Sequence, residues 1–226
     1  MKIGILGTGT VGKTLSGKLA DAGNDVMMGT RDVKALLERR SDDAAESFSA
    51  WHDANSKVAL GSFEETAEFG EVVVNATSGL ASLDVLAGIG QPRLKGKILI
   101  DVANALDFSK GMPPSLAYCN TDSLGERIQR ALPHTKVVKT LNTMNALVMV
   151  NPRLIGEGDH HVFVSGDDPI AKRKVADYLR IWFGWKNAID LGDITTARAA
   201  EMLLPLWLQL WGALDTPMFN FKIVRQ

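Results

Sequence analysis

Cysteine is almost absent from this sequence of 226 residues, which contains only Cys119. A lone cysteine cannot close a disulfide within the chain, so the framework that stabilises many small secreted domains is excluded. We also expect neither a signal peptide nor a transit peptide ahead of a glycine motif that begins at Gly7. These features predict a cytoplasmic protein, and we assign no chemistry to the thiol.

An excess of charge of either sign is also missing. The 25 basic and 26 acidic side chains leave a net charge of −1, so no overall field favours nucleic acid or an anionic membrane as a partner. The most apolar stretch, residues 202–214, is too short to cross a bilayer and contains Pro205 and Gln209. We predict that it is a buried helix, and that the partners are small molecules or a second copy of the chain.

Side-chain sets for metal binding or nucleophilic catalysis are not recognisable either. His134, His160 and His161 lack the spacing of metal ligands, and no Ser-His-Asp or Cys-His set is apparent. We expect each of these histidines to be structural, and we assign neither a metal site nor a catalytic residue.

The sequence does contain a regular alternation of short apolar runs and helical segments. Hydrophobic residues make up 46% of the chain and charged residues 23%, which is typical of a protein with a packed core. Apolar runs separated by helices predict crossover connections and a mainly parallel, doubly wound α/β sheet. The runs are residues 3–6, 26–28, 58–60, 72–76, 98–102, 137–141, 162–165 and 188–191.

Local signals place several helices between these runs. A helical period between the first two runs makes residues 1–28 a strand-helix-strand unit. Ser62 and Ser123 are each followed three residues later by a glutamate, a pattern that begins helices. Residues 40–56 are polar and lack a clear period, so we expect an irregular excursion there. Further helices are expected at residues 169–182 and 195–214.

The first apolar run is followed directly by a G-x-G-x-x-G motif, which comprises Gly7, Thr8, Gly9, Thr10, Val11 and Gly12. Between a strand and a helix, this motif is typical of a dinucleotide site of Rossmann type. Its glycines allow a tight turn, close approach of the backbone to a pyrophosphate, and close packing of helix and strand. We predict a Rossmann domain at residues 1–151 and a small C-terminal α/β extension at residues 152–226 that closes the cleft.

The end of the second strand indicates which nucleotide is bound. NAD-selective sites commonly place an acidic residue there to hold the ribose hydroxyls. This chain has Thr30 and Arg31 instead, with Lys34 one helical turn later. Arginine can bind a phosphate through two hydrogen bonds, so the pattern favours the 2′-phosphate of NADP. The alternative is that Arg31 is a solvated surface residue and that Asp32 only caps the next helix.

Polar residues follow three later strands, at the edge where ligands of open α/β sheets bind. Asn75, Ala76 and Thr77 lie at the carboxyl end of the fourth run, and we predict that they contact the nicotinamide ribose. Asn104 and Asn142 occupy equivalent positions after the next two strands and are expected to line the same cleft. The alternative for the segment with Asn75 is a polar loop that only ends the strand.

The last helix carries more large apolar side chains than one core face requires. Trp207 and Trp211 lie one helical turn apart, and an alternating, strand-like tail follows at residues 219–223. We predict that this face and the tail are buried between the subunits of a homodimer. The alternatives for the tryptophan face are packing in the chain's own core and stacking against a substrate.

The chain resembles the deazaflavin-dependent NADP reductase family over nearly its whole length. The resemblance is carried by the motifs above, by residues 137–143 and by the helix with Arg198, Glu201 and Pro205. The chain is also similar to the reductase domains of metalloreductases. The resemblance implies hydride transfer between NADP and 8-hydroxy-5-deazaflavin or a flavin. It places the pyrophosphate at Thr8 to Val11, the 2′-phosphate at Thr30, Arg31 and Lys34, and the nicotinamide at Ala76, Thr77, Met144 and Ala146.

One position departs from that family, which has a histidine where this chain has Asn142. We predict an NADP(H)-dependent oxidoreductase with a small-molecule electron acceptor. The alternatives are a hydroxyacid or imine reductase in which Lys139 or Asn142 polarises the substrate, and a non-enzymatic NADP sensor. The sequence leaves open the acceptor, the direction of transfer and the oligomeric state.

Overall fold

Strands and helices alternate along the chain. The computed structural model describes residues 1–39 and 47–226. The strands are β1 (Lys2–Leu6), β2 (Asp25–Thr30), β3 (Val58–Ser62), β4 (Val72–Asn75), β5 (Ile98–Asp101), β6 (Leu106–Asp107), β7 (Ser115–Leu116), β8 (Lys136–Thr140), β9 (Val162–Ser165) and β10 (Ala188–Gly192). The helices are α1 (Thr10–Asp21), α2 (Val33–Glu38), α3 (Phe48–Ala54), α4 (Phe63–Phe69), α5 (Gly79–Ile89), α6 (Gln91–Leu94), α7 (Leu124–Ala131), α8 (Ala146–Val150), α9 (Pro169–Tyr178) and α10 (Ala197–Leu214).

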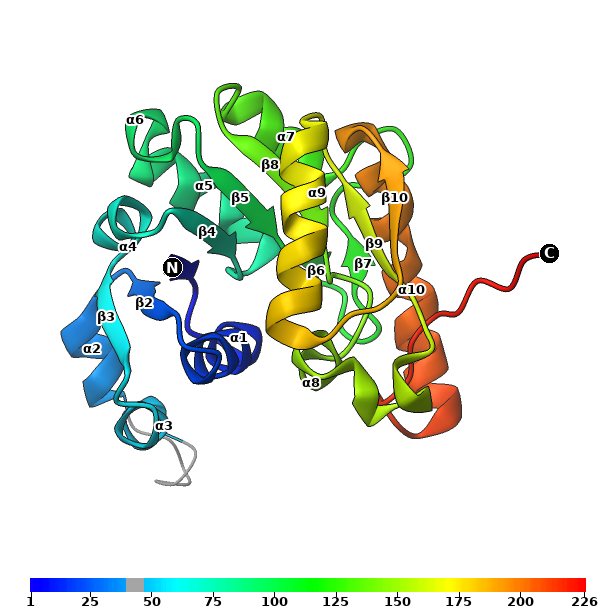
Figure 1. Ribbon diagram of the computed structural model, residues 1–226, viewed down its shortest axis with the longest axis horizontal. Helices are drawn as coiled ribbons and strands as arrows, with labels where there is room; N and C mark the ends of the chain where they lie inside the picture. Colours follow the sequence, from blue (N-terminus) through cyan, green and yellow to red (C-terminus); the bar gives the residue numbers. More distant parts are fainter. Residues whose placement is uncertain (40–46) are drawn as a thin grey trace.

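One sheet contains all strands except β6 and β7, in the order β10-β9-β8-β5-β4-β1-β2-β3 (Figure 1). From β3 to β8 the neighbours are parallel, which confirms the predicted Rossmann-like fold. β9 pairs antiparallel with β8, and β10 runs parallel to β9. The sheet therefore continues across residue 151, and the predicted division into two domains at that point stays a prediction.

Helices cover both faces of this sheet, and each face has its own apolar core. On the face toward the viewer in Figure 1, α1, α8 and α9 pack on the strands. On the other face lie α4, α5, α6, α7 and α10. The valines and isoleucines of the central strands point alternately into the two cores, as expected for a parallel sheet covered on both sides.

The predicted helix starts are confirmed at both serines. The hydroxyl of Ser62 accepts from the backbone N–H of Glu65 at 3.1 Å, and the Glu65 carboxylate accepts from the Ser62 N–H at 2.7 Å. The hydroxyl of Ser123 accepts from the N–H of Glu126 at 3.2 Å. These local bonds satisfy backbone donors at the starts of α4 and α7.

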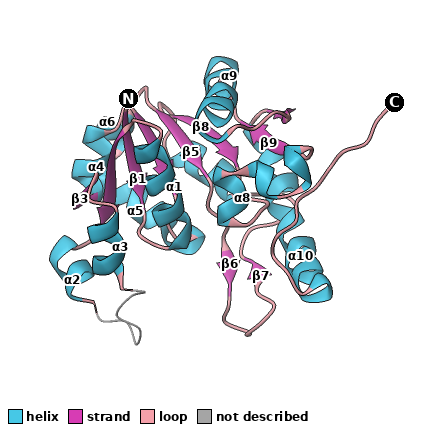
Figure 2. Cartoon of the chain, turned by 60° about the horizontal axis from the view of Figure 1, so that its bottom comes forward, coloured by secondary structure: helices cyan, strands magenta, loops and turns pink. Residues whose placement is uncertain are grey.

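The expectation of an irregular segment at residues 40–56 is wrong in its second half, since α3 spans Phe48–Ala54. Ser47 caps this helix by accepting from the N–H of Ala50 at 3.1 Å, and Phe48 packs into the core. Residues 40–46 lie outside the described part of the chain. A second feature that the sequence did not predict is the β6–β7 pair, which stands apart from the large sheet (Figure 2).

The last helix and the tail differ from the prediction. Trp207 is only 7% exposed and stacks on Phe219 of the same chain with ring centroids 5.4 Å apart. The tail has no strand and is held by the chain itself, since the carbonyl of Phe221 accepts from the N–H of His161 at 3.0 Å. The exposed apolar side chains of α10 are instead Met202, Leu206, Trp211 and Leu214.

Within residues 1–39 and 47–226, none of the helices combines the length and apolar character needed to cross a membrane.

Candidate dinucleotide and acceptor site

The turn between β1 and α1 is built so closely that two of its glycines cannot be replaced. Gly7 has a φ of +114°, and a Cβ placed on it would lie 2.5 Å from the carbonyl oxygen of Ala76. A Cβ on Gly12 would lie 2.1 Å from the carbonyl oxygen of Gly7. The absence of these two side chains therefore allows β1, the end of β4 and α1 to meet.

Gly9 has a different environment, because a Cβ built on it would meet no atom of the described residues within 4 Å. This residue precedes α1, whose first turn has no side-chain cap among the described residues. The free N–H groups and the helix dipole make this end of α1 suitable for an anion. The open space and the uncapped donors fit the pyrophosphate of a dinucleotide.

A cavity of about 750 Å³ opens beside this turn. Gly7, Thr8 and Gly9 form one part of its wall, and the loop after β4 forms another. The remaining lining residues come from the end of β2, α2, the start of α4 and α5, and they are Thr30, Arg31, Asp32, Ala35, Leu36, Arg39, Phe63, Glu64, Ala81, Asp84, Val85 and Gly88.

Two arginines supply positive charge at the β2 end of this cavity. Arg31 is one of the predicted residues, whereas Arg39 was not singled out from the sequence. Lys34 does not line the cavity; its side chain is 84% exposed and its ammonium lies 3.9 Å from the carboxylate of Glu38. Asp32 caps α2 by accepting from the N–H of Ala35 at 2.9 Å, which agrees with the alternative role considered for that residue.

Helical geometry explains why Arg39 and not Lys34 reaches the cavity. Positions 32, 35, 36 and 39 lie on one face of a helix, and the residues there line the cavity. Lys34 and Glu38 lie on the opposite face. The same periodicity, applied to residues 32–39 of the sequence, would have identified Arg39.

A second cavity of about 550 Å³ adjoins the first, and the two share Ala76, Thr77 and Ser78. Of the predicted residues, it is lined by Val11, Ala76, Thr77, Asn104, Asn142 and Met144. The β6 strand adds Leu106 and Asp107, and the following loop adds Phe108 and Ser109. The two cavities therefore form one continuous path along the carboxyl edge of β2, β1, β4, β5 and β8.

The amides of Asn104 and Asn142 hold the loops after β5 and β8 together. Asn104 Nδ2 donates to the carbonyl oxygen of Asn142 at 2.8 Å, and Asn142 Nδ2 donates to Asn104 Oδ1 at 3.1 Å. Asn142 Nδ2 also donates to the carbonyl oxygen of Ala200 at 3.2 Å, which ties this point to α10. These amides therefore shape the wall of the second cavity through bonds within the protein.

Several predicted residues do not line either cavity. Asn75 is fully buried, and its amide oxygen accepts from the hydroxyl of Thr77 at 2.7 Å. It therefore supports a lining residue. Thr10, Gly12, Lys34 and Ala146 also lie outside the two cavity walls.

Lys139 is fully buried between two carboxylates. Its ammonium lies 2.9 Å from Asp101 and 2.9 Å from Glu201, and it also donates to the carbonyl oxygen of Ala103. Burial disfavours the charged form, but the carboxylates of Asp101 and Glu201 outweigh this effect, so the pKa of Lys139 is raised. The ammonium does not reach either cavity, which argues against its proposed role in polarising a substrate.

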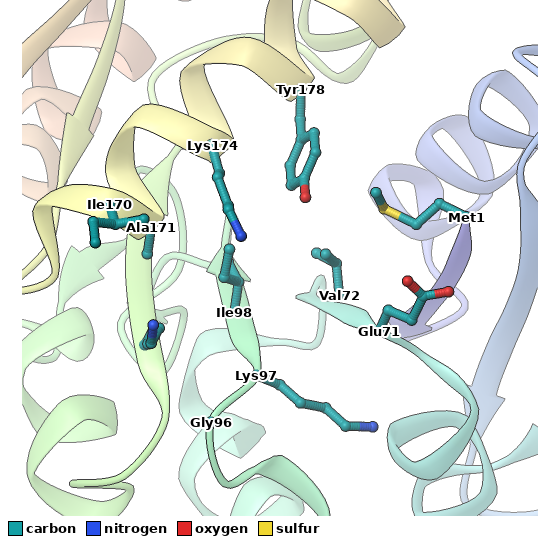
Figure 3. Close-up of a pocket in the computed structure, with 11 residues that line it drawn as sticks. Met1, Glu71, Val72, Gly96, Lys97, Ile98, Ile170, Ala171, Lys174 and Tyr178 are labelled. Carbon is teal, nitrogen blue, oxygen red and sulfur yellow. The ribbon is translucent and has the colours of Figure 1, made fainter.

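A smaller cavity of about 210 Å³ lies at the opposite edge of the sheet, where β4 and β5 begin (Figure 3). Its charged side chains include Glu71, Lys97 and Lys174, with the hydroxyl of Tyr178 facing the same space. Lys97 Nζ donates to the carbonyl oxygens of Ala67, Glu68 and Gly70 around the end of α4. This lysine therefore serves the packing of α4, far from the glycine turn.

The glycine turn, the strand order and the path along the carboxyl edge together define a dinucleotide-binding protein of Rossmann type. A family model described as NADP oxidoreductase coenzyme F420-dependent matches residues 2–105, which include β1 to β5 and the glycine turn. A crystal structure from Arthrobacter sp. FB24, assigned to the F420-dependent NADP reductases, is 56% identical, covers 100% of both chains and has a TM-score of 0.95. The chain belongs to this family and is an NADP-dependent oxidoreductase.

Curated relatives extend the comparison. The F420-dependent NADP reductase of Methanothermobacter marburgensis is 29% identical over 215 residues, which are 93% of this chain and 92% of that protein. Metalloreductase STEAP3 of Rattus norvegicus is 28% identical over 213 residues, which are 91% of this chain but only 38% of that longer protein. The resemblance expected from the sequence is thus confirmed, and the non-enzymatic interpretation is not supported.

Proposed function

We propose that this enzyme transfers a hydride between NADP(H) and a planar deazaflavin- or flavin-like acceptor. The observation that carries the proposal is the continuous path formed by the two cavities, which share Ala76, Thr77 and Ser78. The first cavity has the arginines expected at a 2′-phosphate, and the second has room for a ring beside the nicotinamide. The names of the relatives from Arthrobacter and Methanothermobacter support the choice of a deazaflavin.

In this proposal the nucleotide lies with its pyrophosphate at the start of α1, against Thr8, Gly9, Thr10 and Val11. Thr30 and Arg31 bind the 2′-phosphate, with Arg39 as a further cation and Lys34 in a peripheral position. The nicotinamide end lies against Ala76, Thr77, Asn104, Asn142 and Met144. Gly7 lines the first cavity at the turn, whereas Gly12, Asn75 and Ala146 lie outside both cavity walls and support the turn and the loops.

When bound, NADPH supplies a hydride from C4 of its nicotinamide ring, and a deazaflavin takes it at a ring carbon while a solvent proton goes to a ring nitrogen. The chain orients the two rings and excludes water. Of the described residues that line the second cavity, Asp107 is the one with a carboxyl group. The backbone N–H of Ser109 lowers the pKa of Asp107, so its carboxyl is an anion at neutral pH and a poor proton donor. Direct transfer without an obligatory general acid follows.

The test uses NADPH deuterated at C4 and a panel of deazaflavin, FMN, FAD and quinones, with the loss of NADPH absorbance as the readout. We expect fast oxidation with a deazaflavin and retention of the deuterium on its ring carbon. A carbon-bound deuterium does not exchange with solvent, so its appearance in water would contradict direct transfer. A keto acid and an imine are assayed beside this panel, and oxidation by these alone would favour the alternative reductase class.

We also propose a homodimer formed through the exposed face of α10. Met202, Leu206, Trp211 and Leu214 project from this helix, and residues 202–214 contain no charged side chain. An apolar surface of this kind is typical of an interaction site. Trp207 does not belong to it because it packs within its own chain. A cytoplasmic location stays a prediction from the single cysteine.

A further inference from the structure

A row of buried polar side chains crosses the sheet just beneath the second cavity. Asn75, Asp101 and Lys139 are direct register partners on β4, β5 and β8. Side chains of register partners in a parallel sheet point to the same face, so the three can bond to one another. None of them is more than 1% exposed.

Hydrogen bonds connect this row from end to end. Asn75 Nδ2 donates to Asp101 Oδ1 at 2.9 Å, and Lys139 Nζ donates to Asp101 Oδ2 at 2.9 Å. The ammonium also contacts Glu201 of α10 at 2.9 Å. Glu201 in turn accepts from the N–H groups of Leu124 and Gly125, at 2.8 and 3.0 Å, where α7 begins.

The row reaches the second cavity at two points. At one, Asn75 Oδ1 accepts from the hydroxyl of Thr77 at 2.7 Å, and Thr77 lines both cavities. At the other, Asp101 Oδ1 accepts from the N–H of Ala103 at 3.2 Å while Lys139 donates to the Ala103 carbonyl. Ala103 is itself a lining residue of the second cavity.

A buried network of this kind is better explained by a role in positioning nearby residues than by a contribution to the stability of the fold. Removing charges from water is costly, and replacing a buried ion pair with apolar residues is often neutral or stabilising. A fully satisfied network, however, allows only one arrangement of its members. In this chain that arrangement specifies the places of Thr77 and Ala103 relative to α10.

We propose that Glu201, Lys139, Asp101 and Asn75 form a positioning row through which α10 holds Thr77 and the Ala103 backbone against the nicotinamide ring. The inference rests on the proposed function, since it requires the nicotinamide to occupy the second cavity. The row acts on ring alignment, and its members do not touch the 2′-phosphate end. Small misplacements of reacting atoms reduce rates strongly, so the row controls the rate of hydride transfer more than the affinity for NADPH.

The first test replaces Glu201 with glutamine, which keeps the size of the side chain and removes its charge. The matched control is Glu126→Gln: Glu126 also joins α7 to α10, through two contacts of 2.6 and 2.7 Å to Arg198, but it does not belong to the row. We expect Glu201→Gln to lower the single-turnover rate with 8-hydroxy-5-deazaflavin at least tenfold and to leave the NADPH dissociation constant within twofold. Glu126→Gln should leave both within twofold.

A milder pair of variants tests the cavity end of the row. Ser82 is fully buried, accepts from Asn75 Nδ2 at 3.1 Å and lies 2.8 Å from the Thr77 hydroxyl. Ser82→Ala should lower the rate several-fold without weakening NADPH. Ser16→Ala is the control, because the buried Ser16 hydroxyl has no partner among the described residues.

Fluorescence anisotropy of bound NADPH gives a readout that is independent of turnover. We expect lower anisotropy in Glu201→Gln and Ser82→Ala than in the wild type and the two controls, because the nicotinamide ring is held less firmly. Equal rates and equal anisotropy in row variants and controls would overturn the positioning role. Failure of the wild type to bind NADPH would instead overturn the proposed function.

Discussion

The replacement of Lys139 by methionine tests the charge balance beneath the site. Among the described residues, Lys139 is the one cation in contact with both Asp101 and Glu201, at 2.9 Å each, and all three side chains are at most 3% exposed. Removing one member of a buried ion pair costs roughly 3 to 5 kcal/mol, since the remaining charge stays buried without a partner. Two carboxylates lose their partner here, so we expect about 5 kcal/mol, the upper end of that range.

The size of this effect is large compared with the stability of an ordinary domain. Folded proteins are stable by about 5 to 15 kcal/mol, so this substitution removes a third or more of the total. For a chain of this size each kcal/mol corresponds to about 2 to 4 °C, which predicts a fall in Tm of about 10 to 20 °C. Urea unfolding followed by circular dichroism at pH 7 measures the free energy of unfolding directly.

The matched control is Lys136→Met on the same strand. Lys136 contacts Asp168 at 3.1 Å, but both side chains are partly exposed, at 41% and 29%, so a loss of at most about 1 kcal/mol is expected. Adding Asp101→Asn and Glu201→Gln to Lys139→Met should restore stability, because the uncompensated charges disappear. Lys139→Met with a free energy of unfolding within 1 kcal/mol of the wild type would refute this account.

The raised pKa of Lys139 determines how this contribution depends on pH. A lysine with a raised pKa in the folded state stabilises the protein fully below its ordinary value of 10.5, and the contribution is lost only as the pH rises through the raised value. The difference between the wild type and Lys139→Met should therefore not change through titration of this lysine between pH 7 and 9. A decline of that difference in this range would contradict the assignment of a charged lysine.

Three further predictions concern the nucleotide, acid stability and assembly. Arg31→Ala should weaken NADPH by about ten- to a hundredfold and leave NADH nearly unchanged, and Arg39→Ala should act in the same direction; nucleotide titrations that show equal losses for NADPH and NADH would rule out a 2′-phosphate site. Hydrogen bonds from Arg198 lower the pKa of Glu126, so its contribution to stability is present above its ordinary value of 4.5 and is lost as the pH falls through the lowered value. Glu126→Gln should flatten this acid loss in unfolding curves recorded from pH 6 to 3. Trp211→Lys should convert the proposed dimer to a monomer in sedimentation experiments at micromolar concentration, and a monomeric wild type would contradict the dimer.

Much of the fold was predictable because its signals are local. The glycine turn identified the first strand and helix, and the serine-glutamate pairs at Ser62 and Ser123 placed two helix starts. Each of these depends on residues within one or two turns of the chain. The helix α3 was missed because it is only seven residues long and its two large apolar side chains, Phe48 and Trp51, stand among polar residues.

Features that depend on distant parts of the chain were not predictable. The direction of β9 is set by the connection from β8 through α8 and two short turns, which returns the chain antiparallel to β8. The position of Trp207 depends on Phe219 in the tail, which covers it. A pattern of apolar residues on a helix indicates that one face is buried. It does not show whether residues of the same chain or of a second copy bury that face.

At the carboxyl edge of the sheet, the sequence did not predict which polar side chains face the cleft and which are buried. Thr77 and Asn142 line the cleft as predicted, whereas Asn75 and Lys139, from the same strand-end segments, lie in the protein interior. In a half-exposed strand, alternation of polar and apolar residues would reveal which side chains face inward. Both faces of β4 and β8 are covered, so the valines that point to either face give no alternation of polar and apolar residues. The sequence therefore cannot distinguish a buried lysine from one that faces a ligand. The distinction depends on whether a carboxylate lies opposite in register, and in this chain Asp101 on β5 meets that condition for Lys139.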